Sequence, residues 1–256
     1  MAQIPNQYGR PQIATRTAEQ AVDAGLRQYM LKVYNYMALG VAATAVVTLV
    51  LMNNPQLMAA VALGPMKWVL FIAFIGIGWF GPGMMLSSRS SAVAHAFYWA
   101  YAAIAGAILS PMIFAFFKLN LGHLVFRAFA MTALMFAATS LYGYVTKRDL
   151  SGWGSFLVMA TIGLLIVMLG HLLFAAMGWV DAGTSKMLSV VISCVAVLIF
   201  AALSAYETQE IKQMYVETDG TTVVTQKAIF GAFLLYGTFI VMFSHILNIL
   251  GYSSRE

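Results

Sequence analysis

One carboxylate stands out among the residues whose type and position could support chemistry. Glu207 follows the long apolar run SVVISCVAVLIFAALSAY and begins the polar stretch ETQEIK. A charge at membrane depth is costly, so an ionisable residue there is a candidate functional group by default. Two interpretations are open: a carboxylate held inside a helix bundle, or an interfacial glutamate that marks the end of a helix.

Other candidate catalytic or ligand-binding groups are sparse. His171 and His245 fall inside apolar runs, where a histidine holds a proton or, more commonly, stays neutral and hydrogen-bonded. The sequence has no HExxH, no CxxC and no cluster of acidic ligands, so we predict no metal site and no cofactor. GxxxxGK[ST] and GxSxG motifs are also absent, which argues against nucleotide-driven transport and serine hydrolysis. We therefore predict that the protein is not an enzyme.

The composition indicates that these residues are positioned in a membrane. Of the 256 residues, 61% are hydrophobic and only 9% are charged, and the mean hydropathy is +0.83. A soluble domain carries roughly 25% charged residues, so the lipid bilayer is the predicted surrounding of most of this chain. The formal net charge of +5 comes from basic residues in short loops, which indicates membrane orientation and no nucleic-acid partner.

Seven apolar segments are long enough to cross the bilayer, which takes roughly 20 residues of helix. A transmembrane β-barrel would need alternating segments about half as long, so the uniformly apolar runs argue against it. The predicted fold class is all-α integral membrane, a bundle of seven transmembrane helices. The predicted spans are Val33–Met52, Met66–Leu86, Ala92–Phe116, Leu124–Val145, Phe156–Met177, Met187–Tyr206 and Ala228–Leu250.

The distribution of lysine and arginine predicts the orientation. With a cytoplasmic N-terminus, nine of the fourteen basic residues lie inside, as the positive-inside rule favours. Seven crossings then leave the C-terminus outside, unless the seventh span is re-entrant. Residues 1–26 are predicted to form a polar cytoplasmic tail with a lead-in helix from about Thr15, and residues 27–256 a seven-helix transmembrane domain.

Two motifs resemble those of the transmembrane Bax inhibitor motif family. Residues 140–157, SLYGYVTKRDLSGWGSFL, are similar to its signature loop, with Lys147, Arg148 and Asp149 at the turn. Residues 206–211, YETQEI, resemble its Tyr-Asp-Thr-Gln-x-Ile element at the end of the sixth span. The resemblance is closest to the bacterial branch, which includes a modulator of the membrane-bound AAA protease FtsH.

The resemblance implies six helices around a central seventh, location in the bacterial inner membrane, and a calcium leak gated by pH. In that mechanism two aspartates on spans six and seven share a proton, because two close carboxylates cannot both ionise cheaply, and an arginine near span two pairs with one of them. Glu207 matches the first aspartate, and Arg89 in SSRSSAV matches the arginine. The second aspartate falls close to Thr238, which cannot ionise.

The missing second carboxylate leaves three hypotheses. Glu207 pairs with Arg89 alone and stays ionised, so that the pathway is closed or only weakly sensitive to pH. His245, roughly two turns beyond Thr238, titrates in place of the lost acid. Alternatively the chain does not conduct and is a modulator or substrate of the AAA protease, engaged through its polar N-terminal tail.

Overall fold

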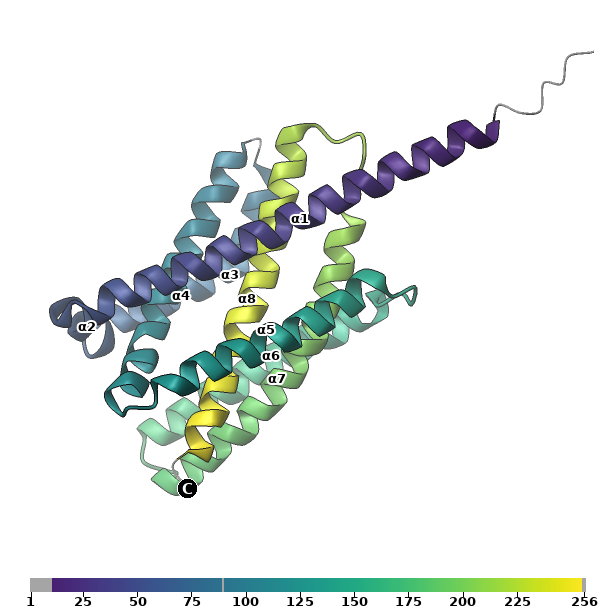
Figure 1. Ribbon diagram of the computed structural model, residues 1–256. Coiled ribbons are helices and arrows are strands. Elements are labelled where there is room, and N and C mark those ends of the chain that lie inside the picture. Colours follow the sequence, from purple (N-terminus) through teal and green to yellow (C-terminus); the bar gives the residue numbers. More distant parts are fainter. Residues whose placement is uncertain (1–10, 89, 255–256) are drawn as a thin grey trace, which may run out of the picture.

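The regular structure of the described residues is entirely helical. The computed structural model describes residues 11–88 and 90–254 (Figure 1). The helices in this part of the chain are α1 (Pro11–Met52), α2 (Pro55–Ala62), α3 (Met66–Ser87), α4 (Ser91–Lys118), α5 (Gly122–Val145), α6 (Ser151–Ala176), α7 (Ala182–Gln213) and α8 (Thr221–Ser253).

Seven of these helices are long and apolar enough to cross a membrane, which confirms the predicted fold class. Each predicted span falls on one of them. Most of the helices run further than predicted, since polar stretches such as ETQEIK at the end of α7 continue the helix.

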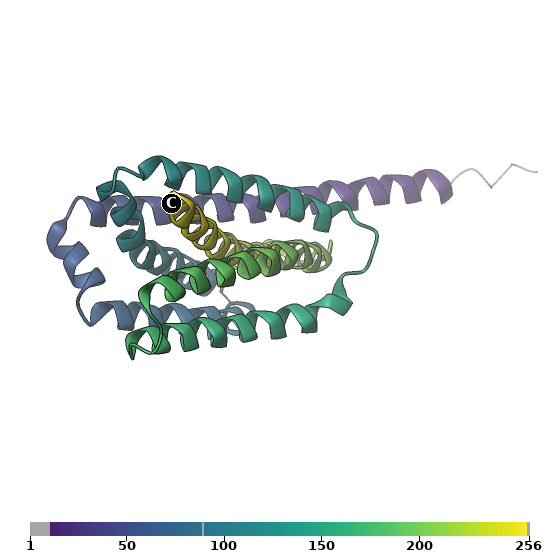
Figure 2. The same ribbon diagram turned by 90° about the horizontal axis from the view of Figure 1, so that it is seen from below.

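The short helix α2 lies outside the predicted spans. The sequence NNPQ reads as a break, but the same residues begin a helix. Pro55 occupies its first turn, where a missing N–H is tolerated, and the Asn54 side chain accepts a hydrogen bond from the backbone N–H of Leu57 at 3.1 Å. Helix α2 connects α1 to α3 at one end of the bundle (Figure 2).

Helix α1 runs without a break from Pro11 to Met52, so the lead-in helix begins earlier than Thr15. The first turns of α1 extend beyond the bundle, and the part from Asp23 to Met52 includes a stretch apolar enough to span a membrane (Figure 1). The backbone has no break at the predicted boundary between residues 26 and 27. Residues 1–10 of the predicted tail lie outside the described part.

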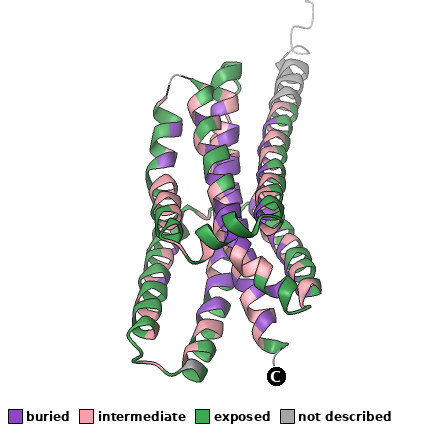
Figure 3. Cartoon of the chain, turned by 90° about the vertical axis from the view of Figure 1, so that its left-hand side faces the viewer, coloured by how far each residue is buried: buried purple, intermediate pink, exposed green. Residues whose placement is uncertain are grey.

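Helix α8 forms the centre of the bundle. In the most apolar stretch of α8, 72% of the residues are buried inside the bundle, against 11% in the corresponding stretches of α3 and of α6. It packs against α1, α3, α4, α5 and α7, whereas α6 packs on α7 (Figure 2). Buried residues gather along the middle of the bundle (Figure 3). This agrees with the expected arrangement of helices around a central seventh span, in which α6 forms an outer layer.

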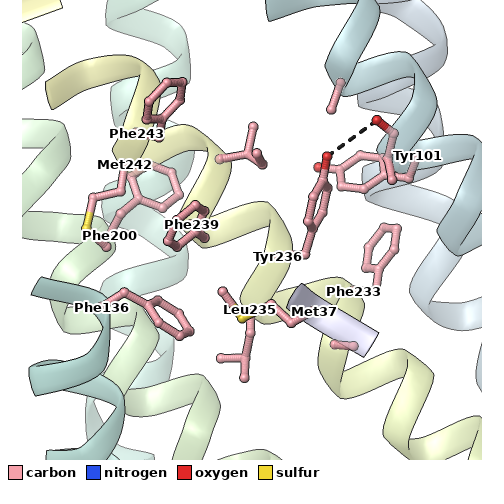
Figure 4. Packing of buried hydrophobic residues seen from close by; sticks show 14 of the residues in the cluster. Met37, Tyr101, Phe136, Phe200, Phe233, Leu235, Tyr236, Phe239, Met242 and Phe243 are labelled. Carbon is pink, nitrogen blue, oxygen red and sulfur yellow. Dashed lines mark hydrogen bonds between the residues drawn. The ribbon is translucent and has the colours of Figure 1, made fainter. Parts of the chain in front are cut away.

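Aromatic rings from α8 fill the core. Tyr236 is fully buried and meets Tyr98 and Tyr101 of α4 edge-on, at centroid distances of 5.9 and 5.8 Å (Figure 4). Phe239 meets Phe136 of α5 in the same manner at 5.7 Å. Such edge-to-face pairs add to the free energy that burial of the rings supplies.

Glycines allow α7 to approach its neighbours closely. A Cβ atom at Gly143 of α5 would lie 2.1 Å from the carbonyl oxygen of Ala205, so only glycine fits there. A Cβ atom at Gly231 of α8 would lie 2.8 Å from the Ile211 side chain. The two contacts lie at the two ends of residues 206–211, so the backbone of this motif packs closely between α5 and α8.

Candidate functional site

Glu207 lies inside the bundle, in the last third of α7. Its side chain is buried, at 9% exposure. Thr238 of the central helix, itself buried, donates a hydrogen bond from its hydroxyl to Oε2 of Glu207 at 2.7 Å. The carboxylate therefore points toward α8 and not toward the headgroups, in agreement with the first of the two sequence interpretations.

Few hydrogen-bond donors surround this carboxylate. A carboxylate can accept about four hydrogen bonds, and within residues 11–88 and 90–254 Thr238 supplies the single one to its side chain. Arg89, the predicted ionic partner, lies outside the described residues, so that pairing stays a prediction.

The neighbours of Glu207 in the motif each contact a different helix. The hydroxyl of Thr208 lies 2.8 Å from that of Ser140 on α5, which lies 2.7 Å from that of Tyr34 on α1. Tyr206 covers Gly154 of α6, where a Cβ atom would lie 2.6 Å from its hydroxyl oxygen. The motif thus joins α7 to α1, α5 and α6, while Glu207 joins it to α8.

Gln209 holds the loop between α5 and α6. Its Oε1 accepts from the backbone N–H of Leu150 at 2.7 Å, and its Nε2 donates to the carbonyl oxygen of Arg148 at 2.9 Å. Lys212, one turn further along α7, donates to the carbonyl oxygen of Tyr144 at 2.9 Å. The two motifs that carry the family resemblance are therefore in direct contact.

The charged side chains of that loop face outward. Lys147, Arg148 and Asp149 are all exposed. Oδ1 of Asp149 accepts from the backbone N–H of Ser151 at 2.9 Å, and hydrogen bonds from Ser151 hold the pKa of Asp149 below its usual range. The loop reaches the interior through the backbone groups bound to Gln209, whereas its charges remain available at the surface.

His245 belongs to a second polar cluster between α7 and α8. Its Nδ1 lies 3.0 Å from the hydroxyl of Ser193, and Nδ2 of Asn248 donates to the hydroxyls of Ser193 and Ser189 at 2.9 and 2.8 Å. At 1.5 Å per residue, Ser193 is about 21 Å from Glu207 along α7. The structure does not bring His245 to Glu207, so a proton on this histidine would act at a separate place.

Apolar side chains separate the two polar clusters. Val197 and Phe200 of α7 are buried here together with Met242 and Phe243 of α8 (Figure 4).

Sequence reasoning missed part of this arrangement. The role of Gln209 and the cluster around Ser193 were not predicted. The available signal was the helical spacing of polar residues within apolar runs: Ser189 and Ser193 are four apart, and His245 and Asn248 three apart, so each pair shares a helix face. Among the described residues, no group of three or more His, Cys, Asp or Glu side chains is placed to hold a metal ion.

Known proteins are similar to this chain over most of its length. The model of the family described as inhibitor of apoptosis-promoting Bax1 matches residues 26–255. An uncharacterized protein of Rickettsia prowazekii is 33% identical, covering 93% of this chain and 95% of the relative. The inner membrane protein YbhL of Escherichia coli K12 is 32% identical, covering 89% and 93%. An uncharacterized protein of Caulobacter vibrioides is 33% identical over 97% of each chain. This chain, a multi-pass membrane protein, therefore belongs to the Bax inhibitor family.

Proposed function

We propose that the protein is a leak pathway for calcium or related cations in the bacterial inner membrane, and that its opening responds to protonation of Glu207. The observation that carries this proposal is the hydrogen bond between Glu207 and Thr238, which connects a buried carboxylate to the central helix. The similarity to YbhL, an inner membrane protein, supports the location. We propose no catalytic activity.

Protonation changes what Glu207 can offer to α8. As a carboxylate it only accepts, and the Thr238 hydroxyl donates to it. As a carboxylic acid it carries an O–H that needs an acceptor of its own, and its charge is gone. One proton therefore alters the contact between α7 and α8, and a change of this kind can bias a helix pair between two arrangements.

Opening would require α8 to move relative to α7. We place the constriction in the stretch between the two polar clusters, where Phe200 and Met242 are buried among other apolar side chains. Hydrophobic constrictions of this kind gate conduction by wetting when they widen. A shift of α8 that follows loss of the Glu207–Thr238 bond would act on this constriction directly, because Thr238 and Met242 lie one turn apart on the same helix.

The threonine at position 238 predicts a simple response to pH. Two carboxylates that share a proton titrate in two coupled steps, whereas one carboxylate titrates in a single step. We expect calcium flux through this protein to follow a one-proton curve. In the Thr238→Asp variant, which introduces an acid opposite Glu207, the curve should broaden or divide into two steps.

Flux through purified protein in calcium-loaded vesicles tests the proposal. Wild-type flux should vary with pH across the physiological range, and flux through Glu207→Gln should not. Glu210→Gln is the matched control, since Glu210 lies on the same helix with a less buried side chain, and it should retain the wild-type response. Absence of flux at every pH would remove the leak function, and an unchanged response in Glu207→Gln would remove Glu207 as the group that senses pH.

The His245→Ala variant tests whether His245 is the group whose titration controls opening. Because His245 bonds to Ser193 at a distance from Glu207, we expect this variant to keep its pH response. A response that disappears in His245→Ala and persists in Glu207→Gln would assign the gating to the histidine.

A second candidate function is favoured by α1. This helix begins at Pro11 and its first turns extend beyond the bundle (Figure 1), and the distribution of lysine and arginine supports a cytoplasmic N-terminus. A helix that projects from the membrane offers a segment for a membrane-bound AAA protease to engage. The protein would then be a non-conducting modulator or substrate of that protease. Co-purification of the protease that is lost on deletion of residues 1–25 would support this function, and its absence would oppose it.

A further inference from the structure

Two cavities lie along one seam between α1 and α5. Both helices pack on α8, so α8 forms the floor of the seam (Figure 1). One cavity has a volume of about 760 Å³, and the residues around it include Arg27, Met30, Tyr34, Phe136, Ser140 and Tyr144. The other, of about 420 Å³, lies nearer α2, and the residues around it include Val41, Met52, Val125, Phe129, Phe239 and Phe243.

The wall of the seam is hydrocarbon. Its polar atoms already have partners within the protein: the hydroxyls of Tyr34 and Ser140 bond to each other at 2.7 Å, and the Thr48 hydroxyl donates to the carbonyl oxygen of Gly106 at 3.1 Å. These polar atoms therefore need no polar ligand. A flexible alkyl chain can fill such a surface without leaving a hydrogen bond unmade.

One end of the seam is positively charged. The exposed side chain of Arg27 lines one end of the larger cavity. The ammonium group of Lys212 lies 5.1 Å from the ring centroid of Tyr144, which lines the same cavity. Asp23, exposed and one turn before Arg27, is the nearest acidic side chain along α1. The basic side chains of Arg27 and Lys212 favour an anionic group at the headgroup level.

We propose that this seam binds an anionic phospholipid, with one acyl chain along the cavities between α1 and α5 and its phosphate against Arg27. The apolar length of the seam and its basic end match the two parts of such a lipid. The cavity volumes lie in the range of small-molecule sites, well below the space that a further helix would need. This site is separate from Glu207 and does not depend on the proposed leak function.

Native mass spectrometry of the full chain, with defined lipids added back, tests whether the basic end of the seam selects an anionic headgroup. Phosphatidylglycerol should bind in preference to phosphatidylcholine with the same acyl chains. Arg27→Gln should reduce that preference about fivefold, the usual effect of one basic residue at an anionic membrane surface. Arg127→Gln is the matched control, because Arg127 is also exposed but lies near the opposite end of α5, and it should leave the preference unchanged.

Two neighbouring alanines test the seam itself. Ala137 and Ala138 are both exposed on α5, but only Ala137 lines the cavity. Ala137→Trp should fill the seam and abolish retention of the lipid, whereas Ala138→Trp should retain it. Thermal unfolding of both variants checks that each is folded.

A photo-crosslinker at Leu141, which lines the cavity and is 60% exposed, identifies the occupant. Attachment to phospholipid supports the proposal. Attachment to a second copy of the chain or to another membrane protein would overturn it. The proposal would also be overturned if wild type and Arg27→Gln showed the same preference between the two lipids. Equal retention of the lipid by both tryptophan variants would overturn it as well.

Discussion

The two sides of α8 are built in different ways. Toward α7, the central helix is held by buried polar contacts at Glu207 and Ser193 and by a glycine that admits the neighbouring helix. Toward the seam between α1 and α5, it presents aromatic and aliphatic side chains to the smaller of the two cavities. The difference indicates which contacts hold helices together in lipid, where apolar burial alone gives little driving force because lipid tails are equally apolar. We expect the α7 side to be rigid and the seam to adapt.

The largest expected effect is at the closest backbone contact on the α7 side. Gly143→Ala places a methyl group against the carbonyl oxygen of Ala205, and overpacking of this kind costs about 2 kcal/mol of unfolding free energy. Gly163→Ala is the control, because nothing lies within 4 Å of a Cβ atom there. Thermal unfolding in detergent should show a clear loss for the first variant and none for the second. Equal stabilities would mean that α5 and α7 are not clamped.

Gln209→Leu should have the next largest effect, because it leaves two backbone groups of the signature loop without their partner. Loss of such hydrogen bonds costs about 1 to 3 kcal/mol. Hydrogen exchange at the Leu150 amide should accelerate. Gln213→Leu, at an exposed position on the same helix, should leave that exchange unchanged. Slow exchange in both variants would show that the loop is held by other contacts.

Tyr236→Phe examines the opposite side of α8 with a smaller expected effect. The Tyr236 hydroxyl bonds to that of Thr44 on α1, and removing a hydrogen bond of this type costs about 1 kcal/mol. Tyr252→Phe, near the C-terminal end of α8, is the control and should be neutral in thermal unfolding. A loss of unfolding free energy greater than that of Gln209→Leu would show that the seam side of α8 is held more firmly than the α7 side.

The smallest expected effect concerns the start of α7. Asp181 accepts hydrogen bonds from the backbone N–H groups of Gly183 and Thr184 at 2.9 and 3.0 Å, and hydrogen bonds from Thr184 hold its pKa below the usual range. Because the folded-state pKa is lowered, this stabilisation is present above the unfolded value and is lost as pH falls through the folded value. Asp181→Ala should therefore melt slightly below wild type at neutral pH, and the two curves should converge in acid. A difference that persists in acid would show that the charge is not responsible.

The spans and their number could be predicted from the sequence because length and apolarity determine them. The choice of Thr238 as the position opposite Glu207 came from the family resemblance, and the two side chains are in contact. That Glu207 faces inward could not be derived from residue types alone. Helix α7 is apolar on every side around Val195–Phe200, so this stretch just before Glu207 does not indicate which face turns toward α8.

Contacts between distant segments were also beyond prediction. The attachment of Gln209 to the loop after α5 depends on how two helices are placed side by side, and the seam depends on how far α1 and α5 stand apart. Neither follows from periodicity. Helix α2 was missed for a local reason, since Asn54 and Pro55 suit a turn and a helix start equally well.

Infrared difference spectroscopy across a pH titration tests most directly whether Glu207 is a protonatable group bonded to the central helix. The account predicts one carboxyl C=O band that appears as pH falls, that is absent in Glu207→Gln, and that shifts in frequency in Thr238→Val because its hydrogen-bond partner is gone. A difference spectrum that is identical in wild type and Glu207→Gln would contradict it.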